Sequence, residues 1–516
     1  MQNVLNITGY KRALILIALG LCVVAALPPI YILPLAFVGF SGFFLFLEKA
    51  PTKRAAFYTG WLFGVGFFGG GLYWLTNAFL VHADKHGWLI PIAVPLLAAS
   101  MGVFIGLTAL MAHMMWRQKK DVSSTLGRIL LFAVAWTLVE WIRSWIFTGF
   151  PWNLMGTIWA FNDAMIQPAA WVGAFGLSFL TVLALTSGAA ILLNAGLKRA
   201  IAISLMLGLP AIMWATGELR LSGSSDEVHE DILLRLVQPN IAQKNKWKRD
   251  QKVKNFQELL ALSEAVGKGG ARPTHIIWPE TAVTYPLNQD KNVALAVASV
   301  VPQGGYVLTG TARMTPKGQK PFQVWNSLVA VNEVGETKGA YDKSHLVPFG
   351  EYIPFRSFIP LPKLTAGSID FSAGPGPQTV KIGDLPSFSP LICYEIIFTN
   401  HVINEKDRPK WLLNLTNDGW YGNSPGPYQH LISARMRSVE EGIPVVRVAN
   451  TGVTMVADAY GRMHASLGYG ERGFIDVALP KPLSKIPIGA RLKTISWGSL
   501  LVIAFVLGQL LLMRRP

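Results

Sequence analysis

Eight apolar stretches of membrane-spanning length constrain the fold of this chain more than any other feature of its sequence. A helix needs about 20 mostly apolar residues to cross the hydrocarbon core of a bilayer. Only 15% of the residues are charged, which fits a chain with much of its surface in lipid. The sequence therefore predicts a multi-pass α-helical membrane bundle of eight spans. Their approximate bounds are 13–28, 30–47, 56–80, 88–114, 128–147, 168–194, 200–217 and 493–513.

The basic residues of the short loops predict how this bundle is oriented. Cytoplasmic loops carry an excess of Lys and Arg. Here such residues gather in alternate loops, whereas the opposite loops hold Lys85 and little else. This distribution accounts for much of the formal net charge of +16 without a nucleic-acid partner. We expect both termini in the cytoplasm. The basic residues on that side are Lys11, Arg12, Lys49, Lys53, Arg54, Arg117, Lys119, Lys120, Arg128, Lys198, Arg199, Arg514 and Arg515.

This orientation divides the chain into three parts. Residues 1–217 form a seven-span bundle, and residues 493–516 form the eighth span with a cytoplasmic tail. Residues 218–492 then lie outside the bacterial inner membrane, in the periplasm of a Gram-negative cell. Their short β-rich runs alternate with amphipathic helices, which predicts a layered α/β domain with a sheet core. Strands are expected at 231–241, 274–280, 305–314, 324–335, 389–397, 411–418 and 445–458, and helices at 249–268 and 427–442.

Three polar residues of the central domain stand where a predicted strand meets a loop. Glu280 ends HIIWPE, Lys343 lies in a polar DKSH patch, and Cys393 follows an apolar run. Taken singly, each fits an ordinary structural role: a surface carboxylate, a solvated ammonium and a buried thiol. The other cysteine, Cys22, lies in an apolar stretch and is expected to be a small hydrophobic residue of a helix.

Together these segments resemble the nitrilase, or carbon–nitrogen hydrolase, superfamily. The resemblance rests on WPE (278–280), DKSHLVPFGE (342–351) and ICYE (392–395). It implies an α-β-β-α sandwich with a catalytic triad: Glu280 as general base, Lys343 as oxyanion and orientation residue, and Cys393 as nucleophile. It also implies that Glu351 supports the lysine.

The spans on both sides of this domain make the chain similar to the apolipoprotein N-acyltransferases, the membrane-bound branch of the superfamily. Further segments carry the similarity: TGFPWN (148–153), QPNIAQKNKW (238–247), WNS (325–327), NDGWYGNSPGPYQH (417–430) and RVANTG (447–452). It implies that the acyl chain of a phospholipid, such as phosphatidylethanolamine, moves to Cys393 and then to the N-terminal amine of a diacylglyceryl-cysteine apolipoprotein. This reaction is the last step of lipoprotein maturation. One thioester that serves two lipid substrates in turn predicts ping-pong kinetics.

Further residues are expected to support the site or contact substrate. Asn326, Tyr394 and Glu395 are supporting candidates. The apolar segment 345–364 predicts a mobile lid at the lipid interface, although an ordinary packed loop fits its composition too, and residues 417–427 are a second candidate lid. Expected substrate or lid contacts are Trp247, Phe349, Tyr352, Phe358, Trp420 and Tyr421. We expect no cofactor and no metal, because the sequence has no Walker, Rossmann or HExxH motif, and we expect a monomer.

Some alternatives remain open on the sequence alone. The first apolar stretch resembles the core of a signal peptide, although six more stretches follow it and favour a retained span. The same triad would serve a membrane-tethered amidase that uses water, and a lipid-binding scaffold or transporter is a non-enzymatic alternative. Glu140 and Arg143, one turn apart in the fifth span, are either functional intramembrane charges or an ion pair that holds helices together.

Overall fold

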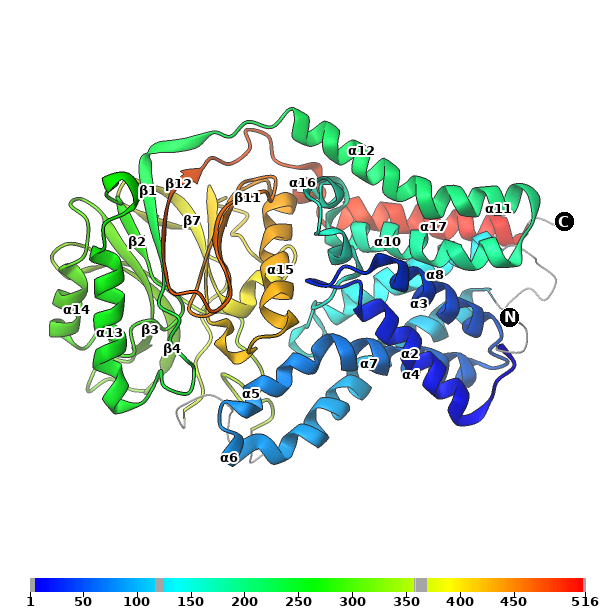
Figure 1. The fold of residues 1–516 in the computed structure, drawn as a ribbon, viewed down its shortest axis with the longest axis horizontal. Coiled ribbons are helices and arrows are strands. Elements are labelled where there is room, and N and C mark those ends of the chain that lie inside the picture. Colours follow the sequence, from blue (N-terminus) through cyan, green and yellow to red (C-terminus); the bar gives the residue numbers. More distant parts are fainter. Residues whose placement is uncertain (1–4, 117–124, 357, 359–368, 514–516) are drawn as a thin grey trace. The chain divides into compact units, whose positions relative to one another are not determined.

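The computed structural model describes residues 5–116, 125–356, 358 and 369–513, and the chain forms two compact units (Figure 1). The first contains residues 1–76, 88–224 and 486–516. The second contains residues 77–87 and 225–485.

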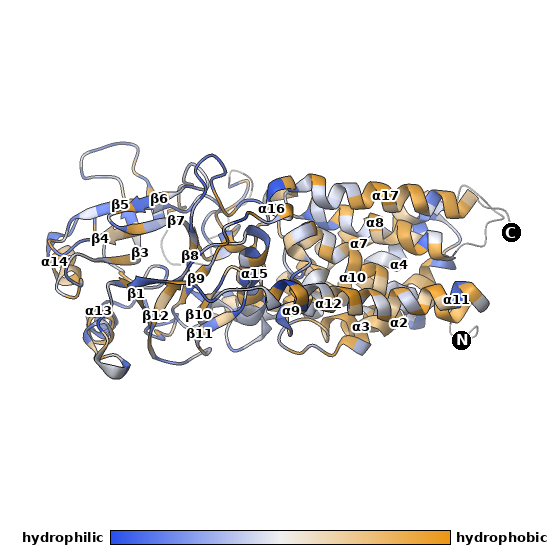
Figure 2. Cartoon of the chain, turned by 90° about the horizontal axis from the view of Figure 1, so that it is seen from above, coloured by the Kyte–Doolittle hydropathy of each residue, from blue (hydrophilic) through white to orange (hydrophobic). Residues whose placement is uncertain are grey.

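The first unit consists of helices, and Figure 2 shows apolar residues along most of their length. Within the described residues, five helices are long and apolar enough to cross a membrane: 83–116, 125–143, 169–193, 196–222 and 494–513. The other long helices are α2 (Gly9–Val24), α3 (Leu33–Glu48) and α4 (Lys53–Leu72). With 16 residues each, α2 and α3 rise about 24 Å, less than the roughly 30 Å hydrocarbon core. Eight spans therefore stay a prediction.

Helix α4 is rich in glycine because it packs closely against a neighbour. Gly60 and Gly64 face α7 (Ile90–Trp116), where a Cβ on Gly64 would lie 2.8 Å from the Cα of Gly102. Small residues let membrane helices approach in this way. Helix α4 stops at Leu72, and a 3₁₀ turn (Tyr73–Leu75) and the short helix α5 (Thr76–Leu80) continue to the end of the predicted span 56–80. Residues 77–87, which hold most of α5 and the short helix α6 (Ala83–His86), fold with the second unit.

Glu140 and Arg143 both bind backbone groups of the segment that follows α8 (Thr125–Arg143). Arg143 Nη1 donates to the carbonyls of Phe150 and, at 2.9 Å, Trp152. Glu140 Oε1 accepts from the backbone N–H of Met155 at 3.1 Å. Both side chains are buried. These contacts favour the structural interpretation of the two charges, in which they hold residues 150–155 against the helix.

The first unit continues with α10 (Ala169–Leu193), α11 (Gly196–Ile203) and α12 (Leu209–Ser222), and ends with α16 (Ile488–Leu492) and α17 (Thr494–Met513). A π-helical turn, Ser204–Gly208, joins α11 to α12. The predicted span 200–217 is therefore one part of a longer helical segment that reaches Ser222.

The second unit is built on two six-stranded sheets. The first has the order β12-β1-β2-β3-β4-β5 and the second β11-β10-β9-β8-β7-β6. Each has three parallel strands in its interior, β1 to β3 and β7 to β9, flanked by antiparallel pairs. The strands are β1 (Val228–Gln238), β2 (His275–Ile277), β3 (Tyr306–Met314), β4 (Val324–Val331), β5 (Thr337–Asp342), β6 (Val380–Ile382), β7 (Leu385–Ile392), β8 (Trp411–Thr416), β9 (Val445–Ala449), β10 (Thr454–Ala457), β11 (Met463–Leu467) and β12 (Gly473–Pro480).

The two sheets and their helices form four layers. A core between the sheets joins residues such as Leu236 and Leu328 of the first to Leu413 and Val448 of the second. On the outer face of the first sheet lie α13 (Arg249–Glu264) and α14 (Lys291–Ala298), which share a second core with it. Helix α15 (Pro425–Glu441) lies on the other side (Figure 1). The expected α-β-β-α sandwich is thus present.

Two predicted strands were wrong in detail. The strand expected at 389–397 ends at Ile392, because residues 393–397 turn into a 3₁₀ helix. The strand expected at 445–458 is two antiparallel strands, β9 and β10, joined by a tight turn at residues 450–453.

Candidate active site

The predicted triad residues all follow the last residue of a strand in the second unit. Glu280 lies three residues after β2, Lys343 directly after β5, and Cys393 directly after β7. The Glu280 turn lies so close to β3 that a Cβ on Gly310 would be 2.3 Å from the backbone nitrogen of Thr281. Only glycine permits this approach. The fold therefore brings together residues that are more than 100 positions apart in the chain.

Two carboxylates and an amide surround the ammonium of Lys343. Lys343 Nζ lies 2.9 Å from Glu351 Oε2 and 3.9 Å from Glu280 Oε1. Asn326 Nδ2 donates to both carboxylates, at 2.8 Å to Glu280 Oε1 and 3.0 Å to Glu351 Oε1. All four side chains are buried. Glu351 also accepts from the N–H of Val347 at 2.8 Å, so it holds both the lysine and its own loop in place.

These contacts set the charge of each group. Burial alone would lower the pKa of Lys343, but Glu351 and Glu280 outweigh it and raise that pKa, so the ammonium keeps its proton. Burial raises the pKa of Glu280, and the nearby Lys343 opposes this shift only in part. Glu280 is therefore a better proton acceptor than an exposed glutamate would be.

Cys393 stands at a sharp turn between β7 and the 3₁₀ helix Cys393–Ile397. Its φ of +53° lies in the left-handed region, which is uncommon for a residue other than glycine. Its carbonyl accepts from Asn414 Nδ2 at 3.3 Å and lies 3.1 Å from His430 Nε2. Asn414 and His430 thus hold the strained turn in place. Strained backbone at functional sites is usually held by its surroundings in this way.

Glu395 joins this turn to the loop that carries Lys343. Its Oε1 accepts from the Tyr341 hydroxyl at 2.7 Å, from the backbone and hydroxyl of Ser344, and from the N–H of His345. Its Oε2 accepts from the N–H of Ile392 at 2.8 Å. The neighbouring Tyr394 is buried, with its ring 5.1 Å from that of Phe398. Glu395 thus connects the Cys393 turn to the loop after β5, and the supporting roles of Tyr394 and Glu395 stay predictions.

Cys393 is buried, with 7% of the residue exposed. Burial raises its pKa to about 12; the charge of Glu280 adds to the shift and that of Lys343 opposes it. The Thr416 hydroxyl, near this thiol, donates to Asp418 Oδ1 at 3.1 Å. The thiol of Cys393 is therefore neutral at rest, and it would have to lose its proton to a nearby base in order to act as a nucleophile.

A buried network next to the Cys393 turn was not predicted. Arg447 Nη2 lies 2.6 Å from Asp418 Oδ2, and Asp418 Oδ1 lies 2.9 Å from His430 Nδ1. Arg447 Nη1 donates to Asn414 Oδ1 at 2.6 Å. The network thus ends at the two side chains that hold the Cys393 carbonyl. An arginine inside the apolar strand VVRVA was a signal, because a buried charge requires a partner.

Asp418→Asn is expected to lower the free energy of unfolding by about 3–5 kcal/mol, because the buried guanidinium of Arg447 would lose its ionic partner. Burial alone would raise the pKa of Asp418, but Arg447 and His430 lower it to about 2. The stabilisation is therefore complete above the unfolded-state pKa of about 4 and is lost as the pH falls toward 2. Unfolding of the full-length protein in detergent, measured at pH 7 and pH 3, checks this. The exposed Asp226→Asn is the control, and equal transitions for both variants would contradict the prediction.

Lys246 is a second buried lysine at the site, and it too was not predicted. It is 1% exposed, and its Nζ donates to the carbonyl of Glu280 at 2.9 Å. Burial lowers its pKa to about 8, while Glu280 and Cys393 oppose the shift. It lies in the segment QPNIAQKNKW, next to Trp247. Because this stretch is polar, the sequence alone could not distinguish it from a surface lysine. It adds positive charge beside the general-base candidate.

The predicted substrate or lid aromatics are partly exposed. Phe349 is 45% exposed and Phe358 83%, and they belong to the described part of the segment 345–364. Residues 357 and 359–364 of that predicted lid lie outside the described residues. Tyr352 accepts from the N–H of Phe349 at 2.8 Å in a tight turn. Trp247 and Trp420 are half-buried. Their roles as substrate or lid contacts stay predictions.

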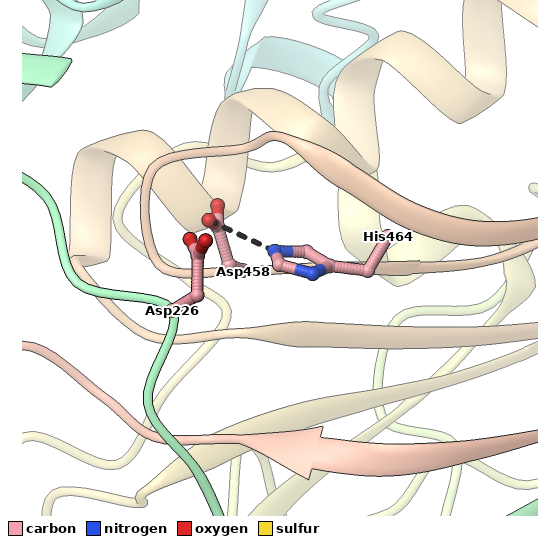
Figure 3. A group of neighbouring side chains, drawn as sticks. All are labelled: Asp226, Asp458 and His464. Carbon is pink, nitrogen blue, oxygen red and sulfur yellow. Dashed lines mark hydrogen bonds and ion pairs between the residues drawn. The ribbon is translucent and has the colours of Figure 1, made fainter.

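One cluster away from these residues has the composition of a metal site. The ligand atoms of Asp226, Asp458 and His464 all lie within 4.8 Å of one another (Figure 3). However, Arg462 Nη2 lies 2.6 Å from both Asp226 Oδ1 and Asp458 Oδ2. The guanidinium thus already supplies the positive charge between the two carboxylates, so we interpret the cluster as an ion-pair network.

Two family models match the chain, one for each of its main parts. The model described as apolipoprotein N-acyltransferase N-terminal domain matches residues 19–187. The model described as carbon-nitrogen hydrolase matches residues 233–484. Together they account for most of the sequence.

Similar proteins extend over nearly the whole chain. A protein of Rhodopseudomonas palustris named apolipoprotein N-acyltransferase is 37% identical, over 98% of this chain and 96% of its own length. A protein of the same name from Agrobacterium fabrum is 36% identical, over 91% and 90%. Among solved structures, the NitN amidase of Nesterenkonia sp. AN1 is 18% identical with a TM-score of 0.35, over 48% of this chain and 93% of that one. A Saccharomyces cerevisiae member of branch 10 of the nitrilase superfamily is 17% identical with a TM-score of 0.37, over 50% and 93%.

Proposed function

Because this chain belongs to the apolipoprotein N-acyltransferase family, we propose that it N-acylates lipoproteins, moving a phospholipid acyl chain to the N-terminal amine of a diacylglyceryl-cysteine through a thioester on Cys393. The observation that carries the mechanism is the buried group of Glu280, Lys343 and Glu351, whose charges act on the thiol at the end of β7. Membership of the family supports lipoprotein N-acylation. The charges of Glu280 and Lys343 near Cys393 support transfer of the acyl group through a thioester on that residue.

In the first half-reaction Glu280 takes the thiol proton as Cys393 Sγ attacks the ester carbonyl of the phospholipid. Lys343, held charged by two carboxylates, donates to the oxygen on which negative charge develops. The tetrahedral intermediate then collapses: the ester C–O bond breaks, and the lysophospholipid alkoxide takes the proton back from Glu280. The product is a thioester between the acyl chain and Cys393.

In the second half-reaction the neutral α-amine of the lipoprotein attacks the thioester carbonyl. An α-amine has a pKa of about 7.7–8.0, so a fair fraction is unprotonated at neutral pH. The C–N bond forms and the C–S bond breaks. Glu280 accepts the amine proton and returns one to the departing sulfur, which restores the resting thiol.

Transfer to an amine rather than to water requires that water be kept from the thioester. The site side chains are buried, and the exposed aromatics Phe349, Phe355 and Phe358 offer an apolar surface for acyl chains or lipid. We assign the lid role to the segment 345–364 on this basis. The loop charges support a periplasmic catalytic domain at the bacterial inner membrane and eight spans with both termini in the cytoplasm. We further propose a monomer that uses phosphatidylethanolamine as donor.

The test uses the purified full-length protein in mixed micelles with phosphatidylethanolamine carrying labelled acyl chains. With a diacylglyceryl-cysteine peptide, label is expected in an amide of the peptide, and a peptide with an acetylated N-terminus should receive none. Without peptide, the protein should gain one acyl mass that hydroxylamine removes. Release of labelled free fatty acid at a rate that the peptide does not change would indicate a hydrolase and end the proposal.

A further inference from the structure

Lys246 is a buried charge to which neither half-reaction assigns a role. It lies in a turn between β1 and α13, and its side chain is almost fully enclosed by protein. An ammonium in such a place is costly unless polar or charged partners compensate it. Its Nζ donates to the backbone carbonyl of Glu280 at 2.9 Å. The buried charge is therefore attached to the backbone of the residue that serves as general base.

The carbonyl that Lys246 holds belongs to a strained turn. Thr281, the next residue, has a φ of +44°, which lies in the left-handed region and is an outlier for a β-branched side chain. Strand β3 holds the turn from one side, because the N–H of Gly310 donates to the carbonyl of Pro279 at 3.2 Å. Hydrogen bonds from charged donors are stronger than those between neutral groups. Lys246 thus supplies a strong contact at the peptide where the strain is located.

Two asparagines of the second sheet anchor the segment that carries Lys246. Asn417 directly follows β8, and its Nδ2 donates to Gln243 Oε1 at 2.7 Å. Asn450 directly follows β9, donates to the carbonyl of Ile241 at 2.8 Å and accepts from its N–H at 3.1 Å. The segment is thus fixed to the sheet that carries the thiol, and its lysine reaches the turn of the other sheet that carries the general base.

We propose that Lys246 is a positioning residue, whose ammonium holds the Glu280 backbone so that the carboxylate keeps its place beside Asn326. The proposal rests on the proposed function, because that function makes Glu280 the general base. A base must lie within hydrogen-bond reach of the proton that it takes. A misplacement of about 1 Å can lower a rate by about 10²-fold. Lys246 neither takes nor gives a proton in this role, and it acts on the reaction through Glu280.

Charged groups from several loops face the Glu280 carboxylate, and Lys246 is one of them. Burial raises the pKa of Glu280, and the charge of Glu351 adds to this shift. Lys343 and Lys246 oppose it, because a nearby cation favours the ionised carboxylate. The thiol of Cys393 is a further titratable group at the site and is neutral at rest. Removing the charge of Lys246 leaves the other groups in place, so the pKa of Glu280 should rise further.

The experiment measures how fast an apolar carbodiimide labels Glu280 as a function of pH, in the full-length protein in detergent, with peptide mass spectrometry as the readout. The reagent attacks protonated carboxyls, so labelling slows as the pH rises through the pKa of Glu280. Lys246→Met, which keeps the side-chain length and loses charge and donor, is expected to raise the midpoint by about one pH unit. Lys246→Arg, which keeps both, should stay close to the wild type. Lys244→Met, at an exposed lysine of the same segment, is the control and should leave the midpoint unchanged.

A double variant tests whether Lys246 acts through Glu280. Lys246→Met is expected to slow formation of the acyl-enzyme by about 10–10²-fold, but to have little further effect when combined with Glu280→Gln. Lys246→Gln, which loses the charge, replaces it with the same expectations if the methionine variant does not fold. A labelling midpoint equal to that of the wild type, or equal slowing with and without Glu280→Gln, would overturn the proposal. Carbodiimide labelling needs no lipid, so its result is separate from the outcome of the acyl-transfer test.

Discussion

Cys393→Ala is expected to lose acyl transfer by a factor on the order of 10⁴ or more, because in the proposed mechanism its sulfur carries the acyl chain between two lipids. The protein should also gain no hydroxylamine-sensitive mass when it is incubated with phospholipid alone. Transfer of labelled acyl chains to a lipopeptide and intact-protein mass spectrometry check the two results.

In Cys393→Ala, loss of activity can be separated from loss of folding. The turn at Cys393 is held through its carbonyl and through Glu395, not through the thiol. Alanine at a φ of +53° carries a strain similar to that of cysteine, so the melting temperature should change little. Cys22→Ala, in an apolar helix, is the matched control and should keep full activity. Transfer by Cys393→Ala above one-hundredth of the wild-type rate would refute the thioester.

Glu280→Gln is expected to slow formation of the acyl-enzyme by about 10²–10⁴-fold, the usual contribution of general base catalysis. Glutamine keeps the size of the side chain and an oxygen that can accept from Asn326, so the group around Lys343 should remain assembled. Single-turnover mass spectrometry with phosphatidylethanolamine measures this step without the acceptor.

The pH dependence of the rate of acyl-enzyme formation separates loss of the base from loss of structure. Burial raises the pKa of Glu280, and only its ionised form can accept the thiol proton. In the wild type the rate should therefore rise with pH through a midpoint above the usual glutamate range, and this acidic limb should be absent in Glu280→Gln. Glu336→Gln, at an exposed turn between β4 and β5, is the control. An acidic limb that persists in Glu280→Gln would assign the base to another group.

The sequence predicted those parts of the molecule that local patterns determine. Buried parallel strands are continuous apolar runs, so β2, β7 and β8 and the polar residues after them could be recognised. Strands β5, β6, β11 and β12 are more polar or shorter and lie toward the edges of the sheets, where the pattern is weak. Lys246 could not be recognised, because a polar residue in a loop shows nothing about its burial until distant segments pack around it. For a related reason the sequence did not show that residues 77–87 belong to the second unit: apolar composition cannot separate a side chain in lipid from one packed on a protein domain.

The membership of residues 77–87 in the second unit affects how this enzyme can be taken apart. Cutting the chain at its two linkers to obtain residues 225–485 as a water-soluble fragment would discard Asn77 and leave the carbonyl of Tyr421 with one fewer donor. Such a fragment would keep both sheets and every residue of the triad. In that fragment the loop at Tyr421 would lack a contact that the intact protein has, so the surroundings of its site would differ from those in the whole chain.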